Sequence, residues 1–327
     1  GCGNVTTKVQ TITVEDNIDP EFTVPANTTI FTDANCGFNA DPSETGDVED
    51  ESDNCTADLD ATYSDEVEAG DCEGEQVITR TWSLTDDCGN TTTQVQIITV
   101  EDNTDPTFTV PDNTTIFTDA DCDYDADPSI TGTVDDESDN CSADLTAKYA
   151  DVIVPGSCAG EVIITRTWTL TDDCGNVTEQ DQIITVEDNT APTPVCLNGV
   201  LIPLDPDGER TLVAEDVFDF SASFDNCSTV SVTDISPAII DCDDVGGLTS
   251  IQVTASDDCG NEATCTATIE VSDITALPSP WEGVDIGNPG SGNTYSYNPC
   301  VDEFTIEGGA YNTPTPTDNL ATISQTL

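Results

Sequence analysis

The feature that most constrains this chain is an internal repeat marked by a Cys-Gly-Asn triplet. The triplets begin at Cys2, Cys88, Cys174 and Cys259. Successive copies are 86, 86 and 85 residues apart, and residues 97–104 recur letter for letter at 183–190. A period of this length is too long for a solenoid and is typical of bead-like domains in tandem. The sequence therefore predicts a row of similar small domains rather than one large fold.

The phase of the repeat predicts where the domains begin and end. The first residues match the last hairpin strand of a repeat, so we interpret both ends of the chain as cuts through domains of a longer protein. An alternative for the orphan strand at 5–14 is that it completes an unfinished domain of a neighbouring chain. The expected segments are a truncated repeat with its linker at 1–19, full repeats at 20–105 and 106–191, a divergent repeat at 192–275, and a linker with the start of a further β-rich domain at 276–327.

Each repeat is expected to be an antiparallel β-sandwich. Residues 76–84 alternate between apolar and polar side chains, which is typical of a half-buried strand. A hairpin is expected at 75–85 and 91–100, because Gly89 supplies the positive φ that its turn requires. Short strands, frequent turns and one Trp in each full repeat favour an all-β, disulfide-rich array of tandem immunoglobulin-like sandwiches, with a jelly roll as the competing architecture.

The cysteines indicate disulfide bonds formed in an oxidising compartment. The chain has 15 Cys and no His, which disfavours zinc sites. Because each expected strand reverses direction, Cys55 and Cys88 should fall at one end of the first sandwich, and Cys36 and Cys72 at the other. This order predicts pairing inside each repeat, although four cysteines permit three pairings. The predicted bonds of the full repeats are Cys36–Cys72, Cys55–Cys88, Cys122–Cys158 and Cys141–Cys174.

The third repeat has a different set of cysteines. We expect Cys196–Cys265 as a new pair between its first and last strands, and Cys227–Cys259 as the equivalent of Cys55–Cys88. Cys242 then lacks its usual partner, and Cys300 replaces it as Cys242–Cys300. Alternatively, Cys227 pairs with Cys242 and leaves Cys259 over. Cys2 has no partner in either scheme.

The charge of the chain excludes some partners and favours others. Five Lys and Arg residues stand against 66 Asp and Glu residues, which gives a formal net charge of −61. Nucleic acids and anionic membranes bind basic surfaces, so neither is an expected partner. Carboxylates at this density repel one another unless salt screens them or a divalent cation bridges them.

Acidic residues recur in register at three places in each full repeat: the linker, the corner before the second cysteine, and the hairpin turn. The expected strand order brings all three to one junction between domains, where oxygen ligands from flexible loops suit Ca²⁺ better than Mg²⁺. The alternative is that these are solvated surface charges or a halophilic bias. The candidate ligands are Glu15, Asp16, Asn17, Asp19, Glu49, Asp50, Asp53, Asp86 and Asp87 at one junction, and Glu101, Asp102, Asn103, Asp105, Asp135, Asp136, Asp139, Asp172 and Asp173 at the next.

No catalytic arrangement is expected. Without His, the chain has neither a Ser-His-Asp nor a Cys-His arrangement. A carboxylate pair for glycoside hydrolysis could be drawn at will from so many acids, so it indicates nothing. No glycine-rich loop follows a strand and opens a helix, so nucleotide binding is unsupported. We therefore predict that this segment is not an enzyme.

Three motifs that recur in order resemble a known family. The Asp-Asn-Cys corners, Asp-Asp-Cys-Gly-Asn turns and Val-Glu-Asp-Asn-Thr-x-Pro linkers of residues 1–275 are similar to the hyalin-repeat-like (HYR-like) modules of giant secreted surface proteins of the Bacteroidota. The resemblance implies an immunoglobulin-like fold, export by a dedicated secretion system, and a role in adhesion, gliding or an extracellular filament. The third repeat departs from the pattern, since it lacks the acidic corner run and has Ser272-Asp273 in place of Glu-Asp-Asn, so calcium is not expected there.

These observations together predict a structural segment of a secreted cell-surface fibre or adhesin, stiffened by disulfides and by calcium at the junctions. Its expected partners are other copies of itself or other surface proteins, with glycans or surfaces as further candidates. The alternative is a set of spacer repeats that carries a distal glycan-binding or catalytic domain.

Overall fold

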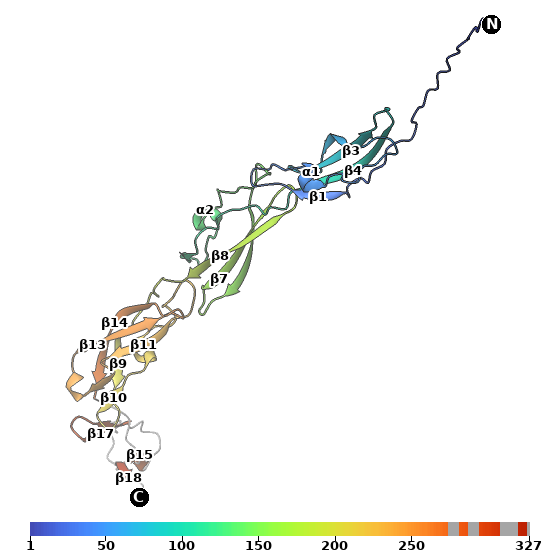
Figure 1. Cartoon of the computed structure of the whole chain (residues 1–327). Helices are drawn as coiled ribbons and strands as arrows, with labels where there is room; N and C mark the ends of the chain where they lie inside the picture. Colours follow the sequence, from blue (N-terminus) through green and yellow to red (C-terminus); the bar gives the residue numbers. More distant parts are fainter. Residues whose placement is uncertain (274–280, 287–293, 308–319, 326–327) are drawn as a thin grey trace. The chain divides into compact units, whose positions relative to one another are not determined.

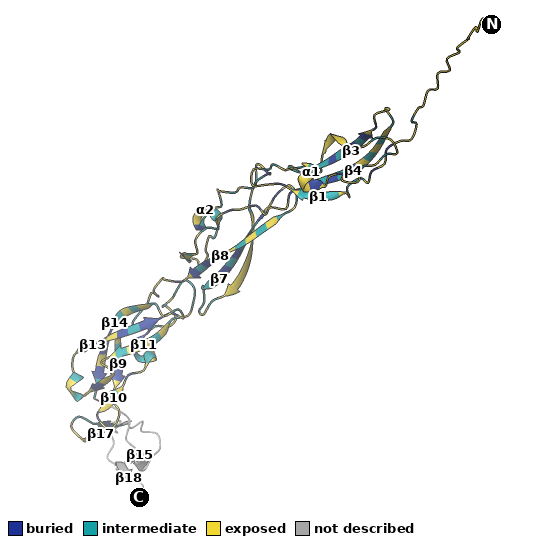
Figure 2. Cartoon of the chain, viewed as in Figure 1, coloured by how far each residue is buried: buried dark blue, intermediate teal, exposed yellow. Residues whose placement is uncertain are grey.

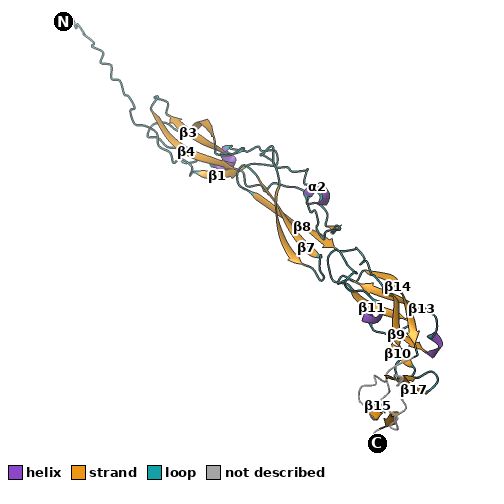
Figure 3. Cartoon of the chain, turned by 180° about the vertical axis from the view of Figure 1, so that it is seen from behind, coloured by secondary structure: helices purple, strands orange, loops and turns teal. Residues whose placement is uncertain are grey.

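The computed structural model describes residues 1–273, 281–286, 294–307 and 320–325, and most of its regular structure is strand (Figures 1 and 3). The chain divides into two compact units. The first consists of Gly1–Asn113, Thr131–Val152 and Thr165–Ile183, and the second of Thr114–Ile130, Ile153–Ile164 and Ile184–Leu327. The expected boundary between the two full repeats therefore lies inside the first unit, and the expected boundary between the second and third repeats lies inside the second unit. The repeat boundaries themselves remain a prediction, and residues 274–280, which include the start of the segment expected at 276–327, lie outside the described residues.

The first repeat is a four-stranded sheet with one short helix. Its elements are β1 (Thr28–Phe31), α1 (Pro42–Thr45), β2 (Thr62–Ala69), β3 (Gln76–Thr85) and β4 (Thr91–Glu101). The sheet order is β1-β4-β3-β2, in which β2, β3 and β4 are antiparallel neighbours and β1 pairs with β4 in parallel. Residues 1–15 are exposed and form no strand, because a β-strand needs a neighbour to bond its backbone (Figure 2).

The core of the first repeat lies between this sheet and extended segments that cover it. Along β3 every second residue is buried, as the alternating sequence predicts. Trp82 and Leu84 pack against Phe22 and Val48, which come from the covering segments. The bridge between Glu21 and Ser52 joins these segments to each other. The two layers form an immunoglobulin-like β-sandwich, and this confirms the predicted fold class.

A buried arginine replaces an apolar residue on the same face of β3. Arg80 is 1% exposed, and its guanidinium forms an ion pair with Asp65 at 2.8 Å. It also donates hydrogen bonds to the Thr45 hydroxyl and the Ala40 carbonyl, and lies 4.2 Å from the ring centre of Tyr63. These contacts satisfy the buried charge and connect helix α1 to the sheet.

The second repeat has the same topology. Its elements are β5 (Thr114–Phe117), α2 (Pro128–Thr131), β6 (Lys148–Pro155), β7 (Val162–Thr171) and β8 (Val177–Glu187), in the sheet order β5-β8-β7-β6. Trp168 and Leu170 pack with Phe108 in the first compact unit. Ile164, Ile184 and Val186 form a separate cluster in the second unit.

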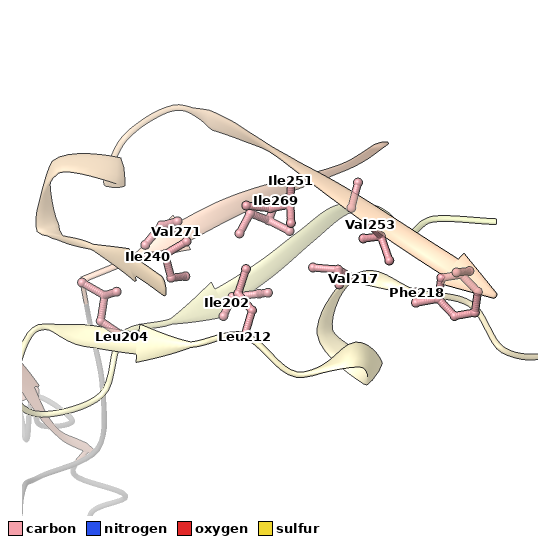
Figure 4. Close-up of a cluster of buried hydrophobic side chains, with 12 residues drawn as sticks. Ile202, Leu204, Leu212, Val217, Phe218, Ile240, Ile251, Val253, Ile269 and Val271 are labelled. Carbon is pink, nitrogen blue, oxygen red and sulfur yellow. The ribbon is translucent and has the colours of Figure 1, made fainter. Parts of the chain in front are cut away.

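The third repeat keeps this plan with additional elements. They are β9 (Asn198–Pro203), β10 (Glu209–Thr211), α3 (Ala214–Val217), β11 (Ser231–Ser236), β12 (Ile239–Asp241), η1 (Cys242–Asp244), β13 (Leu248–Ser256) and β14 (Glu262–Ser272). The sheet order β11-β13-β14-β9 again places a parallel strand beside the last one. Figure 4 shows its core, in which Ile251, Val253 and Ile269 of β13 and β14 gather with Ile202 of β9 and Val217 of α3.

Further along the chain, four strands form two separate two-stranded sheets. They are β15 (Trp281–Ile286), β16 (Thr294–Asn298), β17 (Glu303–Glu307) and β18 (Leu320–Gln325), paired as β15-β18 and β16-β17. The further domain expected to start within 276–327 remains a prediction.

The disulfide bonds correct the predicted pairing. The pairs Cys36–Cys72, Cys122–Cys158, Cys141–Cys174 and Cys227–Cys259 are wrong, because their cysteines bond between neighbouring repeats. The pair Cys55–Cys88 is wrong because both cysteines are free thiols. The observed bonds are Cys36–Cys141, Cys72–Cys174, Cys122–Cys227 and Cys158–Cys259 between repeats, with Cys196–Cys265 and Cys242–Cys300 elsewhere, as expected for those two. The expected sorting of cysteines to opposite ends of a repeat agrees with the structure, but the bonded cysteines at an end join a neighbouring repeat rather than each other.

Candidate cation sites and disulfide staples at the repeat junctions

Two disulfides, here called staples, connect the first repeat to the second within the first compact unit. Cys36 lies in the turn after β1 and bonds to Cys141 in the corner before β6, with their Cα atoms 4.8 Å apart. Cys72 lies in the β2–β3 loop and bonds to Cys174 in the β7–β8 turn, at a Cα distance of 5.2 Å. The second and third repeats are stapled in the same way within the second unit. Each junction is therefore held at two points besides its linker.

The backbone around the first staple admits little variation. Cys36 has a φ of 58°, in the left-handed region that few residues other than glycine adopt. Gly74 packs directly on the bond, since a Cβ atom at this position would lie 2.6 Å from the Cys141 sulfur. Gly160 has the same relation to Cys227 at the next junction. A glycine two residues after Cys72 or Cys158 is therefore part of the staple.

We expect Gly74→Ala to prevent normal closure of the Cys36–Cys141 staple. The matched control is Gly89→Ala, because the φ of Gly89 is 95°, close to the 92° of Gly74, but no atom lies within 4 Å of the position of its added Cβ. The control should lose only about 1 kcal/mol of unfolding free energy through backbone strain. Peptide mapping of the unreduced proteins should find the Cys36–Cys141 disulfide several-fold less abundant in Gly74→Ala than in the parent chain, and equally abundant in Gly89→Ala. Equal effects of the two changes would show that contact with the staple does not matter.

A cluster of three aspartates lies at the end of each of the three repeats that receives the preceding linker. In each cluster one carboxylate comes from the linker, one from the corner before the second cysteine, and one from the hairpin turn. Their candidate ligand oxygens all lie within 4.8 Å of one another. The three clusters are Asp16 with Asp53 and Asp86, Asp102 with Asp139 and Asp172, and Asp188 with Asp225 and Asp257.

At the junction between the first and second repeats, hydrogen bonds orient the carboxylates of Asp102 and Asp139. One oxygen of each of these two carboxylates has no hydrogen-bond partner among the described residues. Asp102 is 7% exposed, and its Oδ1 accepts hydrogen bonds from the Thr32 hydroxyl and the Asn140 amide, at 2.9 and 3.3 Å. Its Oδ2 is buried and has no hydrogen-bond partner among the described residues. Asp139 accepts backbone hydrogen bonds from Cys141 and Ser142 on Oδ2, while its buried Oδ1 has none.

An asparagine completes this site. The Asn140 amide nitrogen donates to the Thr32 hydroxyl and to the Asp33 carbonyl, both in the first repeat, while its carbonyl oxygen is buried without a partner. The hairpin Asn176 donates to the main-chain carbonyl of Asp102 at 3.2 Å and to Asp172 at 2.7 Å, which fastens the linker to the turn. Carboxylate oxygens that lie this close together, some of them buried with unused lone pairs, are the kind of donor set that a hard cation requires.

Hydrogen bonds lower the pKa of two carboxylates in the cluster at the entrance to the first repeat. Backbone hydrogen bonds from Cys55 and Thr56 hold the pKa of Asp53 below its ordinary value. Burial opposes ionisation of Asp86, but hydrogen bonds from Asn90, Gly89 and Cys88 outweigh it, so the pKa of Asp86 is also lowered. The acidic surroundings have the opposite effect on the nearby thiol: a hydrogen bond with Asp16 and burial raise the pKa of Cys55.

The remaining predicted ligands lie outside the clusters. Asp50 and Asp136 instead accept backbone hydrogen bonds from Thr23 and Thr109, each at 2.8 Å. The others are exposed or, for Glu101, half-buried: Glu15, Asn17, Asp19, Glu49, Asp87, Glu101, Asn103, Asp105, Asp135 and Asp173. A cation role for these residues remains a prediction.

The sequence reasoning missed a third cluster and two amides. Asp188, Asp225 and Asp257 repeat the arrangement at the junction where calcium was not expected, and Asp188 Oδ2, Asp225 Oδ1 and the carbonyl oxygen of Asn226 are again buried without partners. The signal was present in the position of the acids relative to the cysteines. The gathered residues are the Asp of Asp-Asn-Cys, the first Asp of Asp-Asp-Cys-Gly-Asn, and the Asp of the Glu-Asp-Asn linker, whereas the acidic run before the corner contributes none of them.

Comparison with known proteins gives neighbours of similar architecture. No known protein family matches the sequence, and no curated protein matches it. Among solved structures, the chain is similar to the EC1-4 region of Drosophila N-cadherin, at 13% identity over 78% of this chain and 75% of that one, with a TM-score of 0.30. It is also similar to an I-band fragment of titin, at 9% identity over 79% and 100% of the two chains with a TM-score of 0.28, and to EC22-24 of mouse cadherin-23, at 14% identity over 78% and 99% with a TM-score of 0.27. At these identities and TM-scores the likeness carries no conclusion about this chain. Among the described residues, no helix has the length and apolar character needed to span a membrane.

Proposed function

We propose that this chain is a structural segment of an extracellular array of immunoglobulin-like repeats, joined by disulfide staples and stiffened by calcium at the junctions. One observation carries the proposal: at each of two junctions, two staples between repeats flank one cluster of converging carboxylates. A staple pair constrains how one repeat can swing on the next, and a cation that bridges linker, corner and hairpin would hold the same three loops together.

The cysteine chemistry supports a location outside the cytosol. Twelve of the cysteines are paired in six disulfides, and such bonds form and persist in oxidising surroundings. The HYR-like motifs support the same placement and point to a surface fibre or adhesin. The partners that fit are further repeats or other surface proteins. Spacer repeats that carry a distal glycan-binding or catalytic domain are the alternative use of the same architecture.

The donor set supports calcium as the cation. Each cluster offers carboxylate oxygens, and two of the three also offer an amide oxygen, from Asn140 and Asn226. These are hard ligands that come from three separate loops, and Ca²⁺ tolerates such irregular geometry, whereas Mg²⁺ demands a near-ideal octahedron and dehydrates reluctantly. Without a cation, carboxylates at this separation repel one another and oppose closure of the junction.

Titration with CaCl₂ of the chain, previously freed of metal with a chelator, tests the proposal. We expect about three ions to bind per chain, one for each cluster, with dissociation constants on the order of 10⁻⁴–10⁻³ M, as in other extracellular modules. Calcium should raise the thermal midpoint and narrow the distribution of interrepeat angles in small-angle scattering, while MgCl₂ at the same concentration should do neither. If calorimetric titration detects no binding, and calcium changes neither the thermal midpoint nor the distribution of interrepeat angles, the carboxylates serve only as solvated surface charge.

A further inference from the structure

Three thiols remain free among the cysteines, and two of them occupy staple positions. Cys55 and Cys88 are exposed thiols in the corner and the hairpin turn of the first repeat. The repeat places them in register with Cys141 and Cys174, and with Cys227 and Cys259. In both of those repeats the two cysteines bond to the repeat before them. The first repeat therefore presents a complete pair of staple positions without their partners.

The surface around these thiols is equivalent to the surface of the second repeat that the first repeat covers. Cys141 is 8% exposed and Ser142 is 7% exposed, whereas Cys55 is exposed and Thr56 is half-buried. Asn140 and Asn226 each donate a hydrogen bond to a carbonyl of the preceding repeat, Asp33 and Asp119 respectively. The equivalent Asn54 is exposed and donates only to Asp16 and to the Cys55 sulfur.

We propose that Cys55 and Cys88 are the acceptor half of a covalent joint for a further repeat of the same kind. The occupied junctions specify what that repeat must present. One requirement is an Asp-x-x-Cys turn such as 33–36, whose aspartate carbonyl receives the asparagine amide. The other is a Cys-x-Gly turn such as 72–74, whose glycine packs on the first staple.

The far end of this same chain does not meet these requirements, so a second copy is not the occupant. The turn after β9 repeats the hydrogen bonds of the turn after β1, since Gly208 donates to the Asp205 carbonyl as Cys36 donates to that of Asp33. Gly208 stands where the staple cysteine would be, and Cys242 is already bonded to Cys300. Copies of this segment therefore cannot be linked head to tail through staples. The repeat that bonds to Cys55 and Cys88 must instead resemble residues 20–105.

Each joint forms by thiol–disulfide exchange with a small-molecule disulfide such as oxidised glutathione. Two thiols become one protein disulfide, and they transfer two electrons and two protons to the oxidant, which is released as two thiols. The inference rests on the stapled array proposed above but not on calcium. All steps of its test are therefore performed in EDTA, so that its failure is distinct from a failure of the calcium sites.

The test compares the chain as it is with an extended chain in which a copy of residues 1–86 precedes Gly1, with serine at Cys2 and Cys55 of the copy so that their peptides are not confused with those of the native cysteines. In the extended chain the copied Cys36 lies 105 residues before Cys55, and the copied Cys72 lies 102 residues before Cys88, which are the separations of the first-junction staples. After incubation with a glutathione redox buffer, free thiols are alkylated and disulfides are mapped. The control is the extended chain with serine also at the copied Cys36 and the copied Cys72.

We expect alkylation of Cys55 and Cys88 in the unextended chain and in the control, at least ten-fold above that in the extended chain, where both should be bonded to the copied cysteines. Persistence of both thiols in an extended chain whose added repeat is folded, as judged by near-ultraviolet circular dichroism, would overturn the proposal. A Cys55–Cys88 bond in any of the three proteins would overturn it as well. So would a dimer of the unextended chain linked through Cys55 or Cys88.

Discussion

Replacement of Cys36, Cys72, Cys141 and Cys174 by serine is expected to produce the largest loss of stability that any set of four substitutions can cause at the first junction. The two staples close loops with sequence separations of 105 and 102 residues. On the chain-entropy account, cross-linking a loop of this size stabilises the folded state by about 5 kcal/mol for a single bond. Guanidinium unfolding without reductant should show the first two repeats unfolding at much lower denaturant than in the parent chain.

The control for this change is serine at Cys2, Cys55 and Cys88, which are free thiols. These substitutions should leave the unfolding midpoint nearly unchanged, because they remove no cross-link. A loss of similar size in the control would contradict the assignment of the stabilisation to the staples.

Cleavage of the linker checks the pairing independently of stability. A protease site inserted after Asn103 separates the chain between the first and second repeats. The fragments of the parent chain should migrate together on a gel without reductant and separate when reductant is added, while those of the four-serine variant should separate in both cases. Pairing within repeats, as the sequence predicted, would release the fragments of the parent chain without reductant.

The second large effect is expected for Asp102→Asn, and its sign should depend on calcium. Asp102 is the linker carboxylate of its cluster, and its Oδ2 is buried without a partner. Removing its charge should weaken calcium binding at this junction about 100-fold and eliminate one of the expected ions. At a calcium concentration about 100 times the dissociation constant, the parent gains about 2.7 kcal/mol of stability from one site, and the variant should lose this gain.

In EDTA the same variant should be as stable as the parent or more stable, because the asparagine removes repulsion between buried carboxylates. The matched control is Asp105→Asn in the same linker, an exposed carboxylate outside the cluster. Its thermal midpoints with calcium and with EDTA should both equal those of the parent. If Asp102→Asn and Asp105→Asn respond alike, the cluster does not bind calcium as a site.

The candidate sites were only partly predictable, and the site at the entrance to the third repeat shows why. The count of acids in the corner favoured the sites at the entrances to the first and second repeats and disfavoured this one. The structure instead gathers one carboxylate from each of three loops, and those three are retained as Asp188, Asp225 and Asp257. The acids of the corner run bond elsewhere or face solvent, as Asp50 does through its contact with Thr23. Local acidity therefore predicted the region in which the carboxylates gather, but it also selected acids that lie outside the clusters.

The sequence by itself determined the features that depend on local pattern. Alternation of side chains determined β3 and β4 and buried Trp82, because successive residues of a strand point to opposite faces. The reversal of the strands also determined which end of a repeat carries Cys36 and which carries Cys55. These conclusions require only the geometry of a strand and its turn.

Only the tertiary structure decided which cysteines bond and which carboxylates converge. A disulfide needs Cα atoms within about 7 Å of each other, and whether Cys36 meets Cys72 or Cys141 depends on how one folded repeat packs against the next. The residues around each cysteine are the same in either arrangement, so no local pattern distinguishes them. The 86-residue repeat therefore specifies similar domains, while the contacts between those domains determine the staples and assemble the candidate cation sites.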